Sequence, residues 1–358
     1  MLAYFMVNFS VILLATFFLL INRSNLNMNN ENKTTTVFLL ITFLVLLLIS
    51  GFRGGFTSDY KNYSNLFHYF NSFSWSEFFN QSFYEEPGFI VLNKIIGSIT
   101  NNEVYFFLIT SFIILALFFR EFRRDSMHIW ISILLFINIG AFYTSFNILR
   151  QIIAVSIIFA GSRYLYNRQF IKYVIIIFIA SLFHQTSWLI LPFYFLLNLK
   201  FNIKNAILTI TLSLFTILFL DSLIDIILRF ISKYSGYAYG MTGLNITSAV
   251  VPVMILIFVL IHHKLIRPDS IKQRIWINAS FYYAFFSILG LKVQMLQRFA
   301  EFFNPFILLI IPLIIYKILN KNLRVIYIII ITFLLIGYNL IVLSGTGYDP
   351  YYFMWEYR

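Results

Sequence analysis

The sequence predicts an all-α, polytopic integral membrane protein with about twelve transmembrane helices (range 10–13). Of its 358 residues, 60% are hydrophobic and only 11% are charged. The mean hydropathy is +0.83. Hydrophobic runs of about twenty residues, the length that crosses a bilayer as a helix, recur along the whole chain. We therefore expect residues 1–358 to form a single integral membrane domain.

Twelve apolar stretches account for the predicted spans. In chain order they lie near residues 2–21, 36–52, 103–119, 128–146, 148–167, 170–184, 187–199, 204–220, 247–263, 275–291, 302–318 and 324–343. The first has no basic region before it and no small-residue cleavage site after it, so we expect a span and not a removed signal peptide. Residues 170–199 are the least regular part, with His184 in their middle. They form either two short spans or one span and a re-entrant piece, which is allowed only where it lines protein or water.

Basic residues predict the orientation, because cytoplasmic loops of membrane proteins are rich in Lys and Arg. If Arg120, Arg123 and Arg124 are cytoplasmic, the alternation of spans places 17 of the 26 Lys and Arg residues on that side. The net charge of +12 then reflects topology, and no nucleic-acid partner is expected. Two long segments fall outside. Residues 53–102 contain amphipathic, aromatic stretches that predict interfacial helices. Residues 221–246 form a Gly/Tyr-rich loop, either a connector or a carbohydrate-contacting lid.

Polar clusters gather on this predicted outer side, where ionisable residues at membrane depth usually mark a function. The first cluster runs from Arg53 to Tyr63. Arg53 offers the planar donor fork that suits phosphate oxygens, and Gly54-Gly55 allows close approach of the backbone to a ligand. Asp59 and Tyr63 lie one helical turn apart if a helix begins there. The alternative is an anchoring arginine followed by an ordinary capped helix.

A second cluster consists of Asn147, Arg150 and Gln151, which share one helix face at i, i+3 and i+4. Gln151 beside Arg150 on that face favours an inward polar pocket over an arginine that snorkels to the interface. In a third cluster, Arg298 and Glu301 occur where a span re-enters from outside. They form either a salt bridge or a phosphate site, and a bridge can also hold the arginine ready for a phosphate.

Two further candidates are His184, between two short apolar segments, and Glu86, in the turn Glu85-Glu86-Pro87-Gly88. A lone histidine is often a hydrogen-bonded structural residue, but the position of His184 at the predicted outer boundary favours a function. Glu86 suits a sugar hydroxyl or the cap of the following helix. The chain has no cysteine, and the remaining histidines are scattered, so no metal site and no cofactor are expected. Mg²⁺ held by Asp59 and Glu86 has no further support.

Together these motifs resemble the EpsG-like branch of the Wzy polysaccharide polymerases. The resemblance extends from about residue 45 to about residue 315, and the motifs occur in the same order. They read GFRGGFTSDYKNYSNLF, EEPGFIVLNKII, FNILRQIIAVSIIFAGSRYLY, ASLFHQTSWLILPFY and QRFAEFFNPFILLIIP. The site residues that the resemblance carries over are Arg53, Asp59, Tyr63, Glu86, Arg150, Gln151, His184, Arg298 and Glu301.

The resemblance implies polymerisation of undecaprenyl-pyrophosphate-linked oligosaccharide repeat units on the outer face of the bacterial inner membrane, into O-antigen, capsule or exopolysaccharide. The donor and acceptor are then lipid-linked oligosaccharides within the bilayer, and a chain-length regulator and a flippase remain open as partners. Inverting transfer needs a base and stabilisation of the departing pyrophosphate. We expect Arg53, Arg150 and Arg298 to bind the pyrophosphate, with Tyr63, Glu86 and Gln151 also contacting substrate. Asp59 is the first candidate base, before His184 and Glu301.

Three alternatives remain at this point. The first is another outer-face polyprenyl-linked glycosyltransferase or an O-antigen ligase, which needs similar residues. The second is a lipid-linked oligosaccharide flippase or other transporter. The sequence disfavours it because the charges gather at one face and no internal repeat is visible. The third is an acyltransferase, for which the cytoplasmic pair His262-His263 lacks acidic partners.

Overall fold

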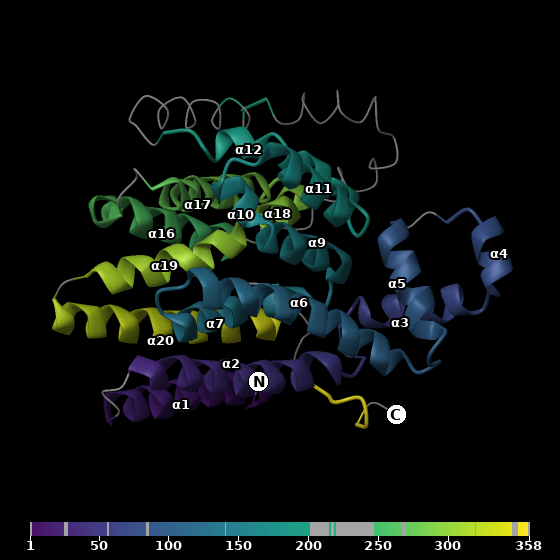
Figure 1. The fold of residues 1–358 in the computed structure, drawn as a ribbon, viewed down its shortest axis with the longest axis horizontal. Helices are drawn as coiled ribbons and strands as arrows, with labels where there is room; N and C mark the ends of the chain where they lie inside the picture. The colour runs from purple at the N-terminus through teal and green to yellow at the C-terminus, as the bar shows by residue number, and fades with distance from the viewer. Residues whose placement is uncertain are drawn as a thin grey trace.

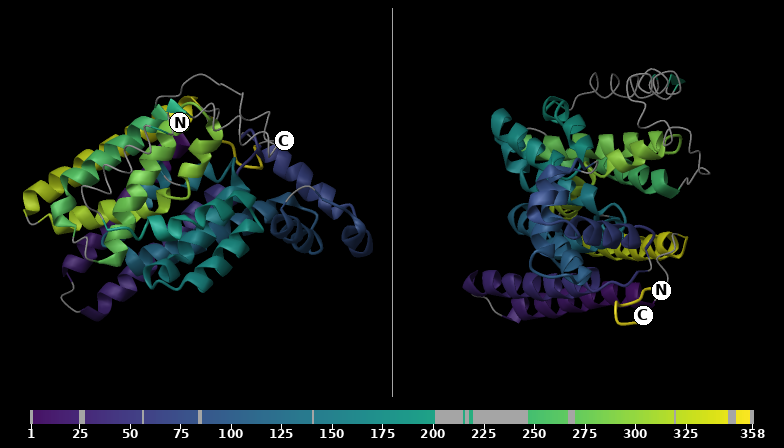
Figure 2. Two further views of the ribbon diagram at one scale, coloured as in Figure 1. Left: turned by 90° about the horizontal axis from the view of Figure 1, so that it is seen from above. Right: turned by 90° about the vertical axis from the view of Figure 1, so that its right-hand side faces the viewer.

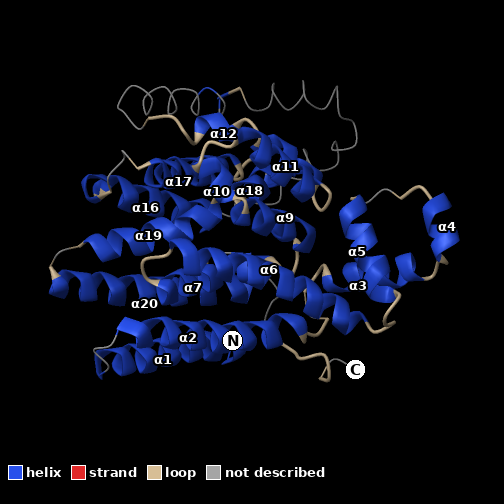
Figure 3. Ribbon diagram, in the orientation of Figure 1, coloured by secondary structure: helices blue, strands red, loops and turns tan. Residues whose placement is uncertain are grey.

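In the computed structural model, the part of the chain that is described consists of helices joined by loops and turns (Figure 3). The described residues are 2–24, 28–55, 57–83, 86–139, 141–200, 215, 218–219, 247–266, 270–318, 320–345 and 350–356. Within these ranges the one β-type pairing is an isolated antiparallel bridge between Arg53 and Phe353. The all-α prediction is confirmed for them.

The longer helices run side by side in stacked layers (Figures 1 and 2). They are α1 (Leu2–Ser24), α2 (Met28–Gly51), α6 (Glu103–Asp125), α7 (Ile129–Asn138), α9 (Leu149–Ala160), α11 (Phe170–Ser181), α16 (Thr247–Ile261), α17 (Ile271–Leu289), α19 (Asn304–Lys317) and α20 (Lys321–Gly345). From one side to the other, α1 packs on α2, α2 on α6, α6 on α9 and α9 on α11. Aromatic rings fill the middle layers: the ring of Phe118 lies 4.6 Å from that of Phe136 and 5.3 Å from that of Phe159 between centroids.

Three helices are long and apolar enough to cross a membrane, at residues Lys33–Gly51, Glu103–Asp125 and Lys321–Ser344. These helices indicate a membrane protein. Further apolar helices in the described ranges are shorter. α11, for example, has 12 residues and a length of about 18 Å, less than the roughly 30 Å of a hydrocarbon core. The predicted count of twelve spans stays a prediction.

Residues 53–102 carry three helices, α3 (Tyr60–Asn71), α4 (Trp75–Asn80) and α5 (Pro87–Gly97), at one end of the stack (Figure 1). Helices were expected in this segment, and their position at a membrane interface stays a prediction. The predicted loop at 221–246 lies outside the described residues.

The irregular stretch 170–199 folds as α11 followed by short elements, and the choice between two short spans and one span with a re-entrant piece stays a prediction. After α11 come the 3₁₀ helix η1 (Gln185–Ile190) and α12 (Phe193–Leu196). His184 lies in the link between α11 and η1. The other short elements are α8 (Ala141–Thr144), α10 (Ser162–Tyr166), η3 (His263–Leu265) and α18 (Gln294–Ala300).

Candidate functional site

A cavity of about 230 Å³ lies where α3, α9, α18 and the α11–η1 link meet. Its lining residues are Asp59, Asn62, Tyr63, Leu66, Ile148, Arg150, Gln151, His184 and Arg298. Six of these nine were predicted as site residues from sequence. Asn62, Leu66 and Ile148 were not. Asp59, Asn62, Tyr63 and Leu66 follow the i, i+3, i+4, i+7 spacing of one helix face, and that periodicity was the signal that could have found the missing members on α3.

Arg150 lies in the first turn of α9, where the amides of the helix also favour negative charge. Its Nη1 donates a 2.7 Å hydrogen bond to Oε2 of Glu86. The guanidinium lies 5.4 Å from the centre of the Phe89 ring. Burial raises the pKa of the Tyr63 hydroxyl, and the neighbouring charge of Arg150 acts in the opposite direction. The contacts with Glu86 and Phe89 fix the guanidinium, yet 32% of its side chain stays exposed to the cavity.

The carboxylate of Glu86 contacts both Arg150 and His184. The second carboxylate oxygen of Glu86, Oε1, lies 3.4 Å from His184 Nδ1. Burial by itself opposes ionisation, but the hydrogen bond with His184 and the charge of Arg150 lower the pKa of Glu86 to about 2. Glu86 is therefore an ionised carboxylate that orients two neighbouring side chains.

Gly88 explains how Glu86 reaches this place. Its N–H donates a 2.7 Å hydrogen bond to the carbonyl of Leu182, in the link that carries His184. A Cβ at position 88 would lie 2.8 Å from that carbonyl oxygen, so a larger residue would push α5 away from the link. Pro87 occupies the first turn of α5, where a missing N–H is harmless. The Glu86-Pro87-Gly88 turn thus serves to place one carboxylate.

Asp59 lines the cavity just before α3, and its side chain does not cap that helix. Burial raises the pKa of Asp59 above its ordinary value, although the charges of Arg298 and Arg150 and a hydrogen bond with Asn62 act in the opposite direction. A carboxylate with a raised pKa beside two guanidiniums can accept a proton from a substrate hydroxyl.

Gln151 and Arg298 bring α9 and α18 together. Gln151 is buried, and its Nε2 donates a 2.5 Å hydrogen bond to the backbone carbonyl of Arg298. The Arg298 side chain is exposed. Among the described residues, no carboxylate lies close enough to form an ion pair with it, Glu301 included. Arg298 therefore faces the cavity with its charge available to a ligand.

Two predicted site residues lie elsewhere. Arg53 is 1% exposed and is not part of the cavity lining. Its guanidinium lies 4.5 Å from the Phe107 ring centre and 4.8 Å from that of Phe146, and it donates to the Ser50 carbonyl. The structure therefore brings together two of the three arginines. Glu301 follows α18 and accepts a 3.2 Å hydrogen bond from Asn304. Burial raises the pKa of Glu301 to about 7.

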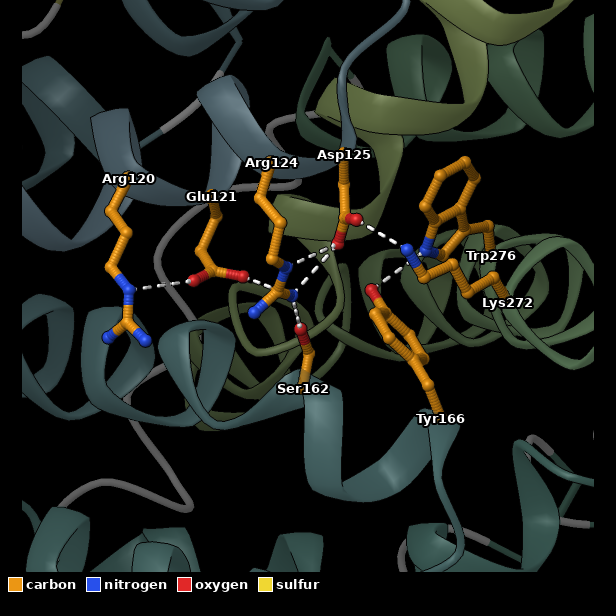
Figure 4. Close-up of polar contacts among 8 residues, drawn as sticks. All are labelled: Arg120, Glu121, Arg124, Asp125, Ser162, Tyr166, Lys272 and Trp276. Atoms are coloured by element: carbon orange, nitrogen blue, oxygen red, sulfur yellow. Dashed lines mark hydrogen bonds and ion pairs between the residues drawn. The ribbon is translucent and has the colours of Figure 1, made fainter.

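A second set of charges lies at the C-terminal end of α6. This α6 cluster consists of Arg120, Glu121, Arg124, Asp125 and Lys272, with Ser162, Tyr166 and Trp276 around it (Figure 4). Sequence reasoning treated its basic residues as markers of topology and did not single out its two acids. Over the described ranges, no group of three or more His, Cys, Asp or Glu residues could hold a metal ion.

Comparison with known proteins gives one match. A family model described as "EpsG family" matches residues 36–358. No curated protein and no solved structure matches the chain. The match covers most of the chain and includes both the cavity and the α6 cluster.

Proposed function

The chain belongs to the EpsG family, and on that premise we propose that it polymerises undecaprenyl-pyrophosphate-linked oligosaccharide repeat units. The resemblance to this family seen in the sequence is confirmed by the match. The family implies a polysaccharide polymerase, which is a glycosyltransferase activity in general. The lipid carrier, the inner-membrane location with an outward-facing site, and the single domain over residues 1–358 are parts of this proposal.

One observation carries the proposal: Arg150 and Arg298, from two helices far apart in sequence, face one cavity together with Asp59. Guanidiniums bind phosphate oxygens through paired hydrogen bonds. The first turn of α9 adds the partial positive charge of a helix N-terminus. A pyrophosphate leaving group carries several negative charges, and such a group is what these donors would stabilise. Arg53 has no part in this binding.

In the proposed reaction, a hydroxyl of the acceptor sugar attacks the anomeric carbon of the donor. A new C–O bond forms there while the bond from that carbon to the pyrophosphate oxygen breaks, and the pyrophosphate leaves with the electron pair. Asp59 accepts the hydroxyl proton. Arg150 and Arg298 stabilise the negative charge that grows on the leaving oxygen.

The remaining residues position these groups. Glu86 and Phe89 hold the Arg150 guanidinium, and Gln151 holds the backbone of Arg298. His184 ranks second as base, because its Nδ1 faces Glu86 and its other ring nitrogen remains for a substrate proton. Glu301 does not line the cavity, and we assign it no catalytic role.

Gene deletion with complementation tests the function. Wild-type chain should restore a ladder of long polysaccharide on a gel, whereas Arg150→Ala should leave single repeat units. Arg150→Lys should restore only part of the ladder, because a lysine lacks the bidentate fork. Arg163→Ala is the matched control, since this exposed arginine contacts Tyr164 and does not line the cavity. A full ladder with Arg150→Ala would contradict the proposal. Absence of lipid-linked units from the outer face would indicate a flippase.

A further inference from the structure

A second cavity, of about 540 Å³, lies on the other face of α3. It is lined by Gly54, Gly55, Tyr60, Lys61, Ser64, Asn65, Asn101, Asn102, Glu103, Val104 and Met354. With 100° between successive residues of a helix, Tyr60, Lys61, Ser64 and Asn65 point away from Asp59, Asn62, Tyr63 and Leu66. One helix therefore separates the arginine-lined cavity from this one, which we call the amide cavity.

The amide cavity has the chemistry of a saccharide site. The side chains of Asn65, Asn101 and Asn102 carry both donors and acceptors, as sugar hydroxyls do. No arginine of the described part of the chain lines it, and the charges of Lys61 and Glu103 have opposite signs. The lining thus suits a neutral, polyhydroxylated ligand better than an anion. Its volume lies within the range of about 300–1,000 Å³ typical of ligand pockets, whereas the arginine-lined cavity is below that range.

Hydrogen bonds within the protein fix the wall of the amide cavity. Glu103 accepts hydrogen bonds of 2.6 Å from Ser64 Oγ and 3.2 Å from the Tyr60 hydroxyl. It also lies 2.7 Å from Nε2 of His68. The Asn102 side chain caps α6 by accepting from the N–H of Val104. Asn65, Asn101 and Asn102 are all exposed, and the side chains of Asn65 and Asn101 make no hydrogen bond to another described residue.

The C-terminal segment closes one side of this cavity. The N–H of Gly54 donates to the Tyr352 carbonyl at 2.7 Å, and the N–H of Met354 donates to the Phe52 carbonyl at 3.0 Å. Next to Met354, the Trp355 ring is 57% exposed and stacks on Phe353 with 4.5 Å between centroids. Exposed aromatic faces of this kind pack well against the C–H surface of sugars.

We propose that the amide cavity binds sugar residues of the lipid-linked oligosaccharide or of the growing polymer, away from the bond being formed. This role rests on the proposed polymerase function. A helix with its side chains is about 10 Å wide, so sugars bound here would lie at least that far from Asp59 and the two arginines. Binding of a remote part of the substrate helps to retain it between successive transfers. The cavity would thus govern how long the product becomes, and the arginine-lined cavity whether any bond forms.

The test variant is Asn65→Ala/Asn101→Ala in the full-length chain, because both side chains are exposed and make no hydrogen bond to another described residue. Asn80→Ala, an exposed asparagine of α4 that lines neither cavity, is the control. In cells the double variant should shift the polymer to shorter chains while the first linkage still forms. Binding to the purified protein is measured with the single repeat-unit oligosaccharide released from the cell's lipid carrier, and with purified polymer. Loss of two amide contacts should weaken binding about tenfold or more.

Binding of the single unit would assign the cavity to the incoming substrate, and binding of polymer alone would assign it to the growing chain. Unchanged affinity for both probes together with wild-type chain lengths would overturn the inference. The proposed function fails separately, if Arg150→Ala still makes long polymer. In that event the oligosaccharide titration still decides whether the amide cavity binds sugar.

Discussion

The two sets of arginine–carboxylate contacts in this protein differ in what their charges face. In the α6 cluster, Asp125 accepts from Arg124 at 2.8 Å and from Lys272 Nζ at 2.5 Å. Glu121 contacts Arg124 and lies 3.8 Å from Arg120. Both carboxylates are 0% exposed. Asp125 accepts hydrogen bonds from two cations, whereas Glu121 forms ion pairs but accepts no hydrogen bond among the described residues. In the arginine-lined cavity, Arg298 and Asp59 form no ion pair with any described residue and line open space.

This difference separates a structural tie from a candidate site. The α6 cluster joins three helices, because Arg124 also donates to Ser162 of α10 at 3.0 Å and Lys272 belongs to α17 (Figure 4). Its cations and carboxylates are paired with one another. At the arginine-lined cavity, Glu86 and Phe89 instead hold the Arg150 guanidinium in place. The exposed part of Arg150 and the side chain of Arg298 can then contact a ligand in the cavity. Buried charge alone therefore does not identify a functional site. The combination of fixed cations with an open cavity does.

The largest expected effect comes from Asp59→Asn, which keeps the shape and removes the base. We expect the rate of transfer by the purified protein to fall by about 1,000-fold, with little change in melting temperature. The base must be ionised, so the wild-type rate should rise with pH through the raised pKa of Asp59 and then level off. The Asn variant should lose this acidic limb. A rate within threefold of wild type would move the role of base to His184, to be tested with His184→Gln.

The contrast between the two regions shows what the sequence could predict. Helix periodicity placed Arg150 and Gln151 on one face, and the density of polar residues marked Asp59 and Tyr63. The pairing of Gln151 with the carbonyl of Arg298 joins residues 147 positions apart and depends on how α9 meets α18. No local pattern encodes that contact.

The position of Arg53 likewise depends on tertiary packing. Its motif suggested a ligand site, but Phe107 of α6 and Phe146 enclose its guanidinium. The position of Glu86 next to Arg150 depends on the close approach of Gly88 to Leu182. The sequence predicts a turn at Gly88 but not its contact with Leu182. Long-range contacts decide which of several dense polar motifs reaches the cavity.

Asp125→Asn is the matched substitution in the α6 cluster and should show the opposite result. Breaking a buried ion pair by removing one partner costs about 3 kcal/mol of stability. We expect a clear fall in melting temperature of the detergent-solubilised protein, while the transfer rate per folded molecule stays near that of wild type. If Asp125→Asn instead lowered the rate and spared the stability, the division into a structural and a catalytic region would be wrong.

The smallest effect is expected at Glu301, a predicted catalytic residue that lies outside the cavity lining. Burial raises the pKa of Glu301 from its ordinary value of 4.5 to about 7. A carboxyl whose pKa is raised on folding contributes full stability below pH 4.5 and loses it as the pH rises through 7. Glu301→Gln keeps an amide that can still contact Asn304 and cannot ionise. At pH 4 the wild-type carboxyl is protonated in both states, so the variant should have the same stability as wild type. At pH 8 the variant should be more stable by about 1 kcal/mol, a modest value because solvent at this partly exposed site weakens the effect. Melting temperatures at the two pH values measure this. A large loss of polymer in Glu301→Gln would return this carboxyl to the catalytic group, whereas unchanged chain length with the pH-dependent gain would place it among the structural acids with Asp125.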